Sequence, residues 1–472
     1  MGRWRRTEAG SVRKFRFPAW SKPVSGFLSS AFLSIPTHNR CVNKNTQSST
    51  ERLTVLDQFC KLIPKHSLSK VCAALDKEGI KIAPRAFSVW SHVVSMVYCH
   101  MSHCISLNDI CDGLQNFRGN LNAIRNATAP HRNTLSHANR TRDAAVIKKL
   151  FWHTLEHYQA THPALFKKGG RSYFRLPHRF KRAIRAIDST TIELITKCMD
   201  WAKHRKHKAA AKVHVALDLI SFIPIRVITD SANHHDGSYM SELCGNMKSG
   251  NIAVMDRAYV DYAQLNTLTE NGVFWVTRSK SNTKLTVIED RNKGKRNEQT
   301  ESKHYPIILS DEEVVLASKT SHARYPHRFR RVEAKVPDSR GAEIKVSFLS
   351  NNLQWAASSI CDLYRCRWGI ETFFKEIKQT LQIRTFVGFS RNAIEWQIWS
   401  ALLTYLLMRI MAFLSSWKRD FKHFFTLMKG ALWAKRSVQL IVSRYGTAEK
   451  DPPPKEPPQT PDLPGINWAM II

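Results

Sequence analysis

Hydrophobic positions between residues 51 and 165 recur every three or four residues, which is the spacing of one face of an α-helix. The repeat is clear over 53–62, 87–101 and 107–114. A further helix is predicted to begin near Asn133, with Asn133 or Thr134 as its N-cap. We therefore expect a helical N-terminal domain over 51–165. DNA binding and structural support of the region that follows are both open as its role.

From residue 182 the pattern changes to the alternation and the short apolar runs that are typical of strands. The run 252–255 is entirely apolar, which indicates a central strand covered on both faces. A mixed sheet covered by helices is therefore expected. The predicted strands are 183–187, 211–219, 223–228, 252–255 and 273–277, with a helix at 259–270.

Residues 281–350 are polar and rich in Lys and Arg, with short alternating stretches, and we interpret them as a β-rich insertion. The chain is then predicted to be helical from 353 to about 445. The apolar run 397–413 in this part is only about 17 residues long and contains Arg409, so it is expected to be a buried core helix and not a membrane span.

The two ends of the chain differ from the rest. Residues 1–50 have little periodicity and much Ser, Asn and Arg, so disorder is expected there. Because no methionine lies between Met1 and Met96, we hypothesise that translation starts near Val42 and that 1–41 are over-annotated; mass spectrometry of the native N-terminus tests this. The Pro-rich tail 446–472 is expected to be disordered or polyproline-like.

The charge of the chain indicates its partner. Lys and Arg number 72 against 38 Asp and Glu, a formal net charge of +34 over 472 residues, which favours a polyanion such as nucleic acid. A ribosomal or chromatin-packing protein would rarely carry 10% aromatics and 13 Trp. Ten cysteines without a CxxC pair indicate a reduced, cytoplasmic interior.

One cluster has the residue types of a zinc site: Cys99, His100, His103 and Cys104. Four ligands from six consecutive residues would form a cramped tetrahedron, and the cluster lies in an apolar helical run. We therefore favour core cysteines with flanking histidines over a metal site.

The most informative stretch holds Tyr364, Arg367, Glu371 and Lys378, at spacings of three, four and seven. On a continuous helix these side chains fall within an arc of about 60°. A carboxylate flanked by cations on one helical face suits a site that holds a metal ion and a phosphate together. An ordinary surface helix with i,i+4 ion pairs is the alternative.

Two further acids stand where strands are predicted to end. Asp188 follows the strand 183–187, and Asp256 follows the strand 252–255. Acids at the ends of neighbouring strands converge, because adjacent strands lie only about 4.8 Å apart. With Glu371 they would form an oxygen-rich pocket of the kind Mg²⁺ prefers, and two such ions about 3.5–4 Å apart promote in-line attack on phosphorus.

This constellation resembles the DDE transposases of bacterial insertion-sequence family four, which carry a Tyr-Arg-Glu-Lys signature. The likeness covers roughly 51–415 and departs from the family at Ala258, where glycine is usual. The residues that carry the resemblance are Asp188, Asp256, Tyr364-x2-Arg367-x3-Glu371-x6-Lys378, Lys212-Val213-His214-Val215, Asp256-Arg257-Ala258-Tyr259, Phe274-Trp275-Val276-Thr277-Arg278 and Thr134-Leu135-Ser136-His137-Ala138-Asn139.

The resemblance implies an RNase H-like, mixed-sheet α/β catalytic domain over 180–445, interrupted by the β-rich insertion 281–350 and preceded by the helical N-terminal domain. It implies Mg²⁺-dependent cleavage at transposon ends, with Mn²⁺ as a substitute, and joining of the freed 3′-hydroxyl to target DNA. The implied partners are double-stranded DNA, as inverted-repeat ends and as target, and a second copy of the chain. No membrane is implied, and the expected location is the bacterial cytoplasm, at the nucleoid when bound to DNA.

Residue by residue, the resemblance implies that Asp188, Asp256 and Glu371 are catalytic and bind the metals. It implies that DNA phosphates near the transposon end are contacted by Tyr364, Arg367 and Lys378, with further backbone contacts from Arg257, Arg278 and Lys280. Trp275 is a candidate to stack on a flipped base, and a core tryptophan is the alternative.

Two other functions share these features. An RNase H-fold nuclease would cut DNA without joining it, and a domesticated DNA-binding protein would do neither. The second is disfavoured by the sequence, because all three acids and the Tyr-Arg-Glu-Lys positions are intact.

Overall fold

The computed structural model describes one compact part of the chain, within Thr46–Ile472. The expectations for 1–50 and 446–472 lie outside the described residues. The residues described are 53–82, 86–167, 180, 182–194, 198, 203–205, 208–231, 235–291, 306–337, 342–381 and 385–445.

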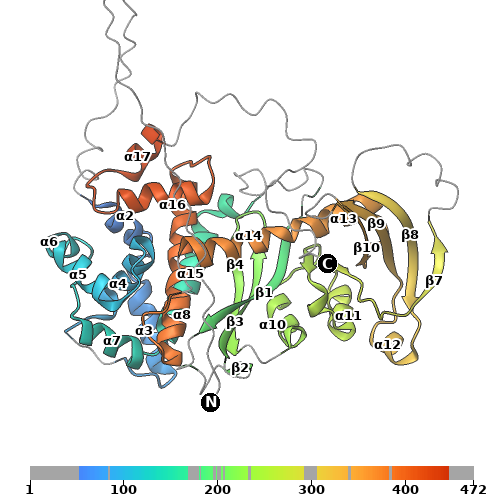
Figure 1. The fold of residues 1–472 in the computed structure, drawn as a ribbon, viewed down its shortest axis with the longest axis horizontal. Coiled ribbons are helices and arrows are strands. Elements are labelled where there is room, and N and C mark those ends of the chain that lie inside the picture. The colour runs from blue at the N-terminus through green and yellow to red at the C-terminus, as the bar shows by residue number, and fades with distance from the viewer. Residues whose placement is uncertain are drawn as a thin grey trace, which may run out of the picture. The chain divides into compact units, whose positions relative to one another are not determined.

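The N-terminal third is helical (Figure 1). Polar caps set several of the boundaries: the Ser88 side chain accepts from the backbone of Ser91 at the start of α4, and Ser106 forms a capping box with Asp109 at the start of α5. The elements are α2 (Val55–Lys61), α3 (Ser67–Lys77), α4 (Val89–Ser102), α5 (Leu107–Asn116), α6 (Arg118–Leu121), α7 (Arg132–Thr141), α8 (Ala145–Thr161) and the 3-10 helix η1 (Pro163–Phe166).

One expected cap differs. The helix α7 begins at Arg132, so its N-cap is His131, whose side chain makes no capping hydrogen bond, and Asn133 lies inside the first turn.

A mixed sheet follows, as the sequence predicts, in the order β2-β3-β1-β5-β6-β10-β9-β8-β7, with β4 paired to β3. In the described residues β1 pairs antiparallel with β3 and parallel with β5, and β5 pairs parallel with β6. The strands are β1 (Ile184–Leu194), β2 (Lys203–Arg205), β3 (Lys208–Asp218), β4 (Ile223–Ser231), β5 (Ile252–Met255), β6 (Phe274–Arg278), β7 (Leu285–Asp290), β8 (Ile307–Leu316), β9 (Phe329–Pro337) and β10 (Glu343–Ser350).

The strands β7 to β10 lie in the segment expected to be a β-rich insertion. They do not form a separate sheet, because Val276, Thr277 and Arg278 of β6 pair with β10. The segment therefore extends the central sheet. Short helices join the strands of the whole sheet. Before the insertion they are η3 (Asp236–Tyr239), α10 (Met240–Cys244), η4 (Arg257–Tyr259) and α11 (Tyr262–Glu270), and within it α12 (Lys319–Arg324).

The C-terminal helices pack against both parts: α13 lies on the sheet, α16 contacts α4, and α15 contacts α4, α8 and β4. The helix α15 matches a membrane span in length and composition, but 89% of its most apolar window is buried inside the protein, as expected of a core helix. The helices are α13 (Ala357–Cys366), α14 (Trp368–Lys375), the π-helical η5 (Glu376–Thr380), α15 (Arg391–Leu414), α16 (Phe421–Gly430) and α17 (Val438–Tyr445).

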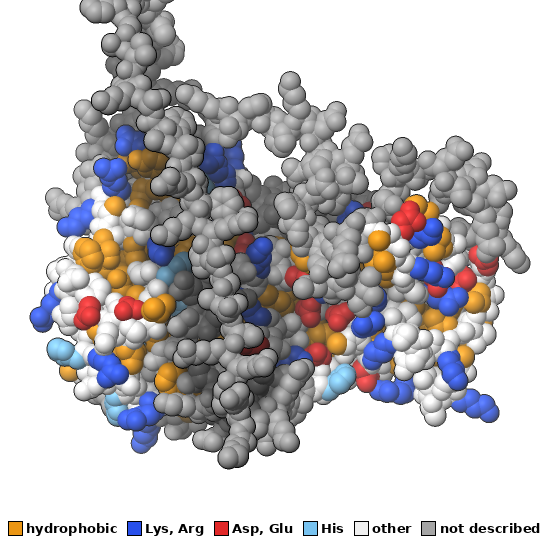
Figure 2. All heavy atoms as spheres, viewed as in Figure 1, with side chains coloured by type: hydrophobic (Ala, Val, Ile, Leu, Met, Phe, Trp, Pro, Cys, Tyr) orange, Lys and Arg blue, Asp and Glu red, His pale blue; other side chains and the backbone are white. Residues whose placement is uncertain are grey.

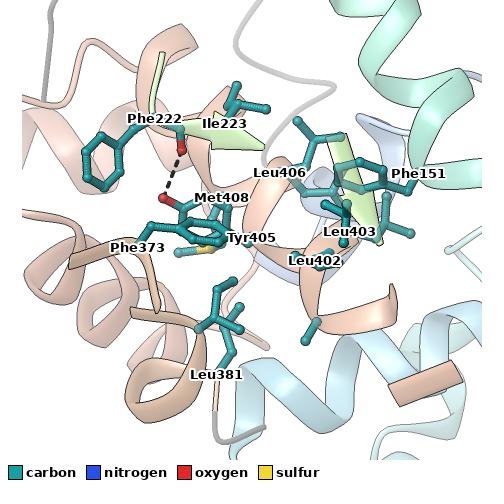
Figure 3. Close-up of a cluster of buried hydrophobic side chains, with 14 of the residues drawn as sticks. Phe151, Phe222, Ile223, Phe373, Leu381, Leu402, Leu403, Tyr405, Leu406 and Met408 are labelled. Atoms are coloured by element: carbon teal, nitrogen blue, oxygen red, sulfur yellow. Dashed lines mark hydrogen bonds between the residues drawn. The ribbon is translucent and has the colours of Figure 1, made fainter. Parts of the chain in front are cut away.

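Figure 3 shows how α15 joins the helical part to the sheet. Leu402, Leu403 and Leu406 lie near Phe151 of α8. On the other side, the Tyr405 hydroxyl donates to the carbonyl of Phe222, in the turn between β3 and β4, at 3.0 Å. Buried residues from the helical part, α15 and the sheet belong to one continuous hydrophobic cluster, so the helical part is a structural neighbour of the sheet.

Candidate active site

Asp188 and Asp256 stand side by side at the end of the parallel strand pair. Ile187 of β1 is in register with Met255 of β5, so the residue that follows each one lies at the same level of the sheet. The sequence had suggested that Asp188 follows the end of its strand, but Asp188 lies within β1. The strand β1 continues to Leu194, because β3 remains beside it as an antiparallel partner.

The segment that carries Glu371 is not one continuous α-helix. It breaks at Arg367, between α13 and α14, and then widens into the π-helical turn η5. The expected α-helix from Tyr364 to Lys378 is therefore interrupted twice, although Arg367 keeps right-handed helical backbone angles and still pairs with Glu371 at i,i+4. Gly369 lets α14 approach the β3–β4 turn, since a Cβ there would lie 2.8 Å from Leu219 Cδ2.

Arg367 joins two of the three acids. Its Nη1 lies 2.6 Å from Asp188 Oδ2 and its Nη2 lies 2.5 Å from Glu371 Oε1, and only 4% of its side chain is exposed. The sequence interpretation made Arg367 a phosphate contact and not an ion-pair partner; here it pairs with both carboxylates. A guanidinium buried between two carboxylates offsets the cost of burying their charges.

Asp256, the third acid, acts electrostatically on Asp188 and Glu371. Burial raises the pKa of Asp188 to about 7, Arg367 opposes the rise, and Asp256 and Glu371 add to it. Burial also raises the pKa of Glu371, with Arg367 again opposing and Asp256 contributing. The three carboxyl groups therefore lie close enough to repel one another.

The donor chemistry of three carboxylates suits a hard divalent cation. Their arrangement does not, because Arg367 binds one oxygen of Asp188 and one of Glu371. Across the described part of the chain, no three His, Cys, Asp or Glu side chains form a group that could hold a metal ion.

Tyr364 and Arg278 are buried next to Asp256 and Arg367. Tyr364 is 2% exposed, its ring packs on Phe348, and its hydroxyl has no hydrogen-bond partner among the described residues. Burial raises the pKa of the Tyr364 phenol and lowers the pKa of Arg278. As the protein stands, both expected DNA contacts are buried beside the acids.

The other expected cations reach the surface. Arg257 follows Asp256 and is exposed. Lys378 donates to the carbonyl of Thr191, three residues after Asp188 on β1, at 2.8 Å, and lines a cavity of about 670 Å³. Lys280 donates to the carbonyl of Val260.

Trp275 lies in the core, which is the alternative that the sequence left open. It is 1% exposed, its indole nitrogen donates to Thr269 Oγ1, and the rings of Tyr325 and Phe329 pack against it. Its ring has no free face on which a base could stack.

A polar network that the sequence did not identify lies on the other face of β1. The Lys212 ammonium is 2.5 Å from Asp236 Oδ1, which also accepts from Ser189 Oγ, and His214 Nδ1 is 2.8 Å from the Tyr259 hydroxyl. Burial lowers the pKa of His214 to about 4. Lys212 and His214 belong to a patch that carried the family resemblance, whereas Asp236 had no signal of its own.

The two histidines of the cysteine–histidine cluster contact the end of the helical segment that carries Glu371. His100 Nδ1 donates to the carbonyl of Leu381 at 3.1 Å, and His103 Nε2 donates to the carbonyl of Thr380 at 2.6 Å. These two contacts tie α4 to the residues at the end of η5.

Comparison with known proteins gives two family matches and several relatives. A model described as a transposase DDE domain matches residues 179–407, and one described as a domain of unknown function, DUF4372, matches residues 51–124. A putative transposase of Sinorhizobium fredii is 32% identical over 274 residues, which cover 58% of this chain and 71% of that protein.

Two further relatives are named for insertion sequences. A probable transposase for IS5377 of Geobacillus stearothermophilus is 30% identical over 49% of this chain and 57% of that protein. A putative transposase for IS4SA of Synechocystis is 25% identical over 48% of this chain and 59% of that protein. A piggyBac transposase synaptic complex with hairpin DNA aligns at 11% identity over 85% of this chain and 82% of that one, with a TM-score of 0.38, which is too weak to bear on the fold.

Proposed function

The chain belongs to the family of transposases with a DDE domain, and from that premise we propose that it catalyses cut-and-paste transposition of an insertion sequence. The observation that carries the proposal is the level placement of Asp188 and Asp256 on paired parallel strands, with Glu371 joined to Asp188 through Arg367. An enzymatic role in DNA cleavage and transfer follows from the family.

The finer assignment is to an RNase H-like core of the Tyr-Arg-Glu-Lys subgroup. In support, the strand order β4-β3-β1-β5-β6 combines antiparallel pairs on one side of β1 with parallel pairs on the other. Tyr364, Arg367 and Glu371 also lie together around the two aspartates.

In this proposal Asp188, Asp256 and Glu371 hold Mg²⁺, or Mn²⁺ in its place. Such a metal would supply Lewis-acid activation of the attacking hydroxyl and stabilisation of the leaving oxygen. Arg367 partly offsets the charges of Asp188 and Glu371, and it would have to move off the oxygen that it binds on each for those oxygens to serve as ligands.

The proposed partners are transposon ends and target DNA, bound by a homodimer in the bacterial cytoplasm. The strong positive charge supports a polyanionic partner, and Figure 2 shows Lys and Arg side chains spread over the drawn face, on the helical part as well as near the insertion. Arg257, which is exposed and follows Asp256, and Lys378, which reaches β1 at Thr191, are further proposed phosphate contacts. Tyr364, Arg367 and Arg278 would join them on rearrangement.

A strand-transfer assay tests this function. The full chain is incubated with Mg²⁺, a pre-cleaved duplex of the element's own end and a supercoiled target plasmid, with Glu371→Gln as the inactive control. Covalent joining of the labelled 3′ end to the plasmid is expected. Hydrolysis without joining would favour the nuclease, and binding without either reaction would favour a domesticated DNA-binding protein.

A further inference from the structure

A second cavity, of about 630 Å³, lies where the helical part meets the sheet. One wall comes from α8, including Trp152, and the opposite wall from β1 and β4. The turn after α10 closes it. The polar side chains that line it are Glu156, Gln159, Arg185, Arg226, Asn246 and Lys248.

This cavity is separate from the candidate active site. Arg185 precedes Asp188 by three residues on β1, so the two side chains point to opposite faces of the sheet, about 10 Å apart along the strand. Asp188 and Asp256 lie at the carboxyl end of the parallel pair. Arg185 lies at its other end, beside the pairing of Ile184 with Ile252.

The arginines of the cavity have donors to spare. Arg185 Nη1 and Arg226 Nε are both buried without a hydrogen-bond partner among the described residues. A buried donor left unpaired costs about 1–3 kcal/mol, so an acceptor that enters the cavity would be stabilised there. Arg367 differs, because two of its nitrogens are bound to carboxylates.

The balance of charge in the cavity is positive. Among the described residues, Arg185, Arg226 and Lys248 line it as cations and only Glu156 lines it as an acid. Asp218 is the cross-strand neighbour of Arg185, but its Oδ2 accepts from the backbone and hydroxyl of Ser221 at 2.8 and 2.6 Å. Burial lowers the pKa of Arg185, with Arg226 adding to the effect and Asp218 opposing it, as expected for cations that are not fully compensated.

We propose that this cavity binds a phosphodiester of DNA outside the catalytic centre, through Arg185, Arg226 and Lys248. Guanidinium groups match the geometry of phosphate oxygens, and the half-buried indole of Trp152 supplies an apolar wall beside them. The cavity is within the range of volumes that hold a ligand of nucleotide size. The inference rests on the proposed function for the presence of DNA, and adds a second place where the DNA is held.

The site also gives α8 a role in DNA binding. The helical part both packs against the sheet through α15 and contributes one wall of a phosphate site. The helical part would then have both roles that the sequence left open: structural support of the sheet through one surface and DNA binding through another.

The test compares Arg226→Gln/Lys248→Gln with Lys65→Gln/Lys70→Gln, which removes the same charge from exposed positions on α3 and the turn before it. Binding of a labelled duplex of the element's end is measured by fluorescence anisotropy over a series of NaCl concentrations. Each lost phosphate contact lowers the slope of log Kd against log salt by about 0.9. Because the cavity is proposed to hold one phosphodiester, we expect a loss of about 0.9 in the cavity variant and a smaller loss in the control, with at least about tenfold weaker binding in the cavity variant at moderate salt.

Lys248→Gln alone, in a turn, keeps the test valid if the double variant does not fold, and is expected to lower the slope by less than about 0.9 because Arg185 and Arg226 remain. Equal slopes for the cavity and control variants would overturn the proposal. A slope unchanged by the variants, together with a Tm that inorganic phosphate raises in the wild type only, would mean that the cavity takes a free anion and not DNA, which also overturns it. Wild-type strand transfer is measured in parallel, so failure of the proposed function shows separately.

Discussion

Two buried arginine–glutamate pairs have their glutamates on the same helical segment and have nearly the same geometry. Arg367 Nη2 is 2.5 Å from Glu371 Oε1, and Arg409 Nη2 is 2.5 Å from Glu376 Oε2. The two arginine side chains are 4% and 1% exposed. Neither burial nor distance separates the pair proposed for catalysis from the other one.

Their surroundings do separate them. The Arg409 guanidinium lies 4.9, 5.0 and 4.4 Å from the ring centroids of Phe222, Tyr405 and Phe421, and the Tyr405 hydroxyl binds both Arg409 and Glu376. Arg409 and Glu376 are thus enclosed by aromatic rings, which is a structural arrangement, and Asp420 adds only the smallest contribution to the raised pKa of Glu376.

Around Arg367 the acids outnumber the cation. Asp188 and Glu371 share it, and Asp256 repels both of them. The excess of acids over the buried cation, and not burial itself, therefore marks the candidate active site.

The largest expected effect is on the first pair. Glu371→Gln should lower Mg²⁺-dependent cleavage of the end duplex at least about ten-thousandfold, because several kcal/mol of transition-state stabilisation depend on the metal ligands. DNA binding by fluorescence anisotropy should change by less than about threefold. Retained cleavage would contradict the assignment of Glu371.

The second pair should respond in stability. Glu376→Gln leaves Arg409 buried without its carboxylate, so the free energy of unfolding should fall by about 3–5 kcal/mol in urea denaturation. Glu371→Gln is the matched variant, and should cost much less because it also removes repulsion with Asp256. Equal losses in the two variants would remove the distinction between the pairs.

A double variant sharpens the same point. Glu376→Gln/Arg409→Met removes both charges of the second pair, and should recover about 3 kcal/mol of the unfolding free energy lost in Glu376→Gln, because methionine can pack among the same rings. Urea denaturation measures it. Glu371→Gln/Arg367→Met should recover no cleavage, whatever its stability.

The smallest effect concerns the end of the segment. Burial lowers the pKa of His100 from 6.5 to about 4, so between these values the unfolded chain binds more protons than the folded one and stability falls as the pH falls. This costs about 2 kcal/mol at pH 5. His100→Gln should therefore reduce the drop in Tm between pH 8 and pH 5, measured by differential scanning calorimetry, and an unchanged drop would show that His100 does not titrate in this way.

The sequence predicted the parts of the site that depend on local pattern. The apolar run before Asp256 identified a central strand, and the short spacing between Arg367 and Glu371 survives because it lies within about one turn. The π-helical turn that contains Lys378 was not predicted, because no residue pattern indicated it.

Other features depended on tertiary packing. Trp275 could be a surface or a core residue until Tyr325 and Phe329, about 50 residues later, were placed against it. The arginine cavity brings together α8, β1 and β4, and its charge is apparent only once Asp218 is seen to be bound to Ser221. The pairing of Arg367 with Asp188 likewise joins residues 179 positions apart.

The pairing of β6 with β10 has a mechanical consequence. Val276–Arg278 are paired with Phe348–Ser350, so the strands from β4 to β7 form one continuous sheet. A hinge between the strands next to the candidate acids and the insertion would have to break the backbone hydrogen bonds between β6 and β10. The β6–β10 pairing would therefore keep the insertion in a fixed orientation relative to Asp188 and Asp256. Any closure on DNA would then come from movements of side chains and surface loops, while the sheet itself stays rigid.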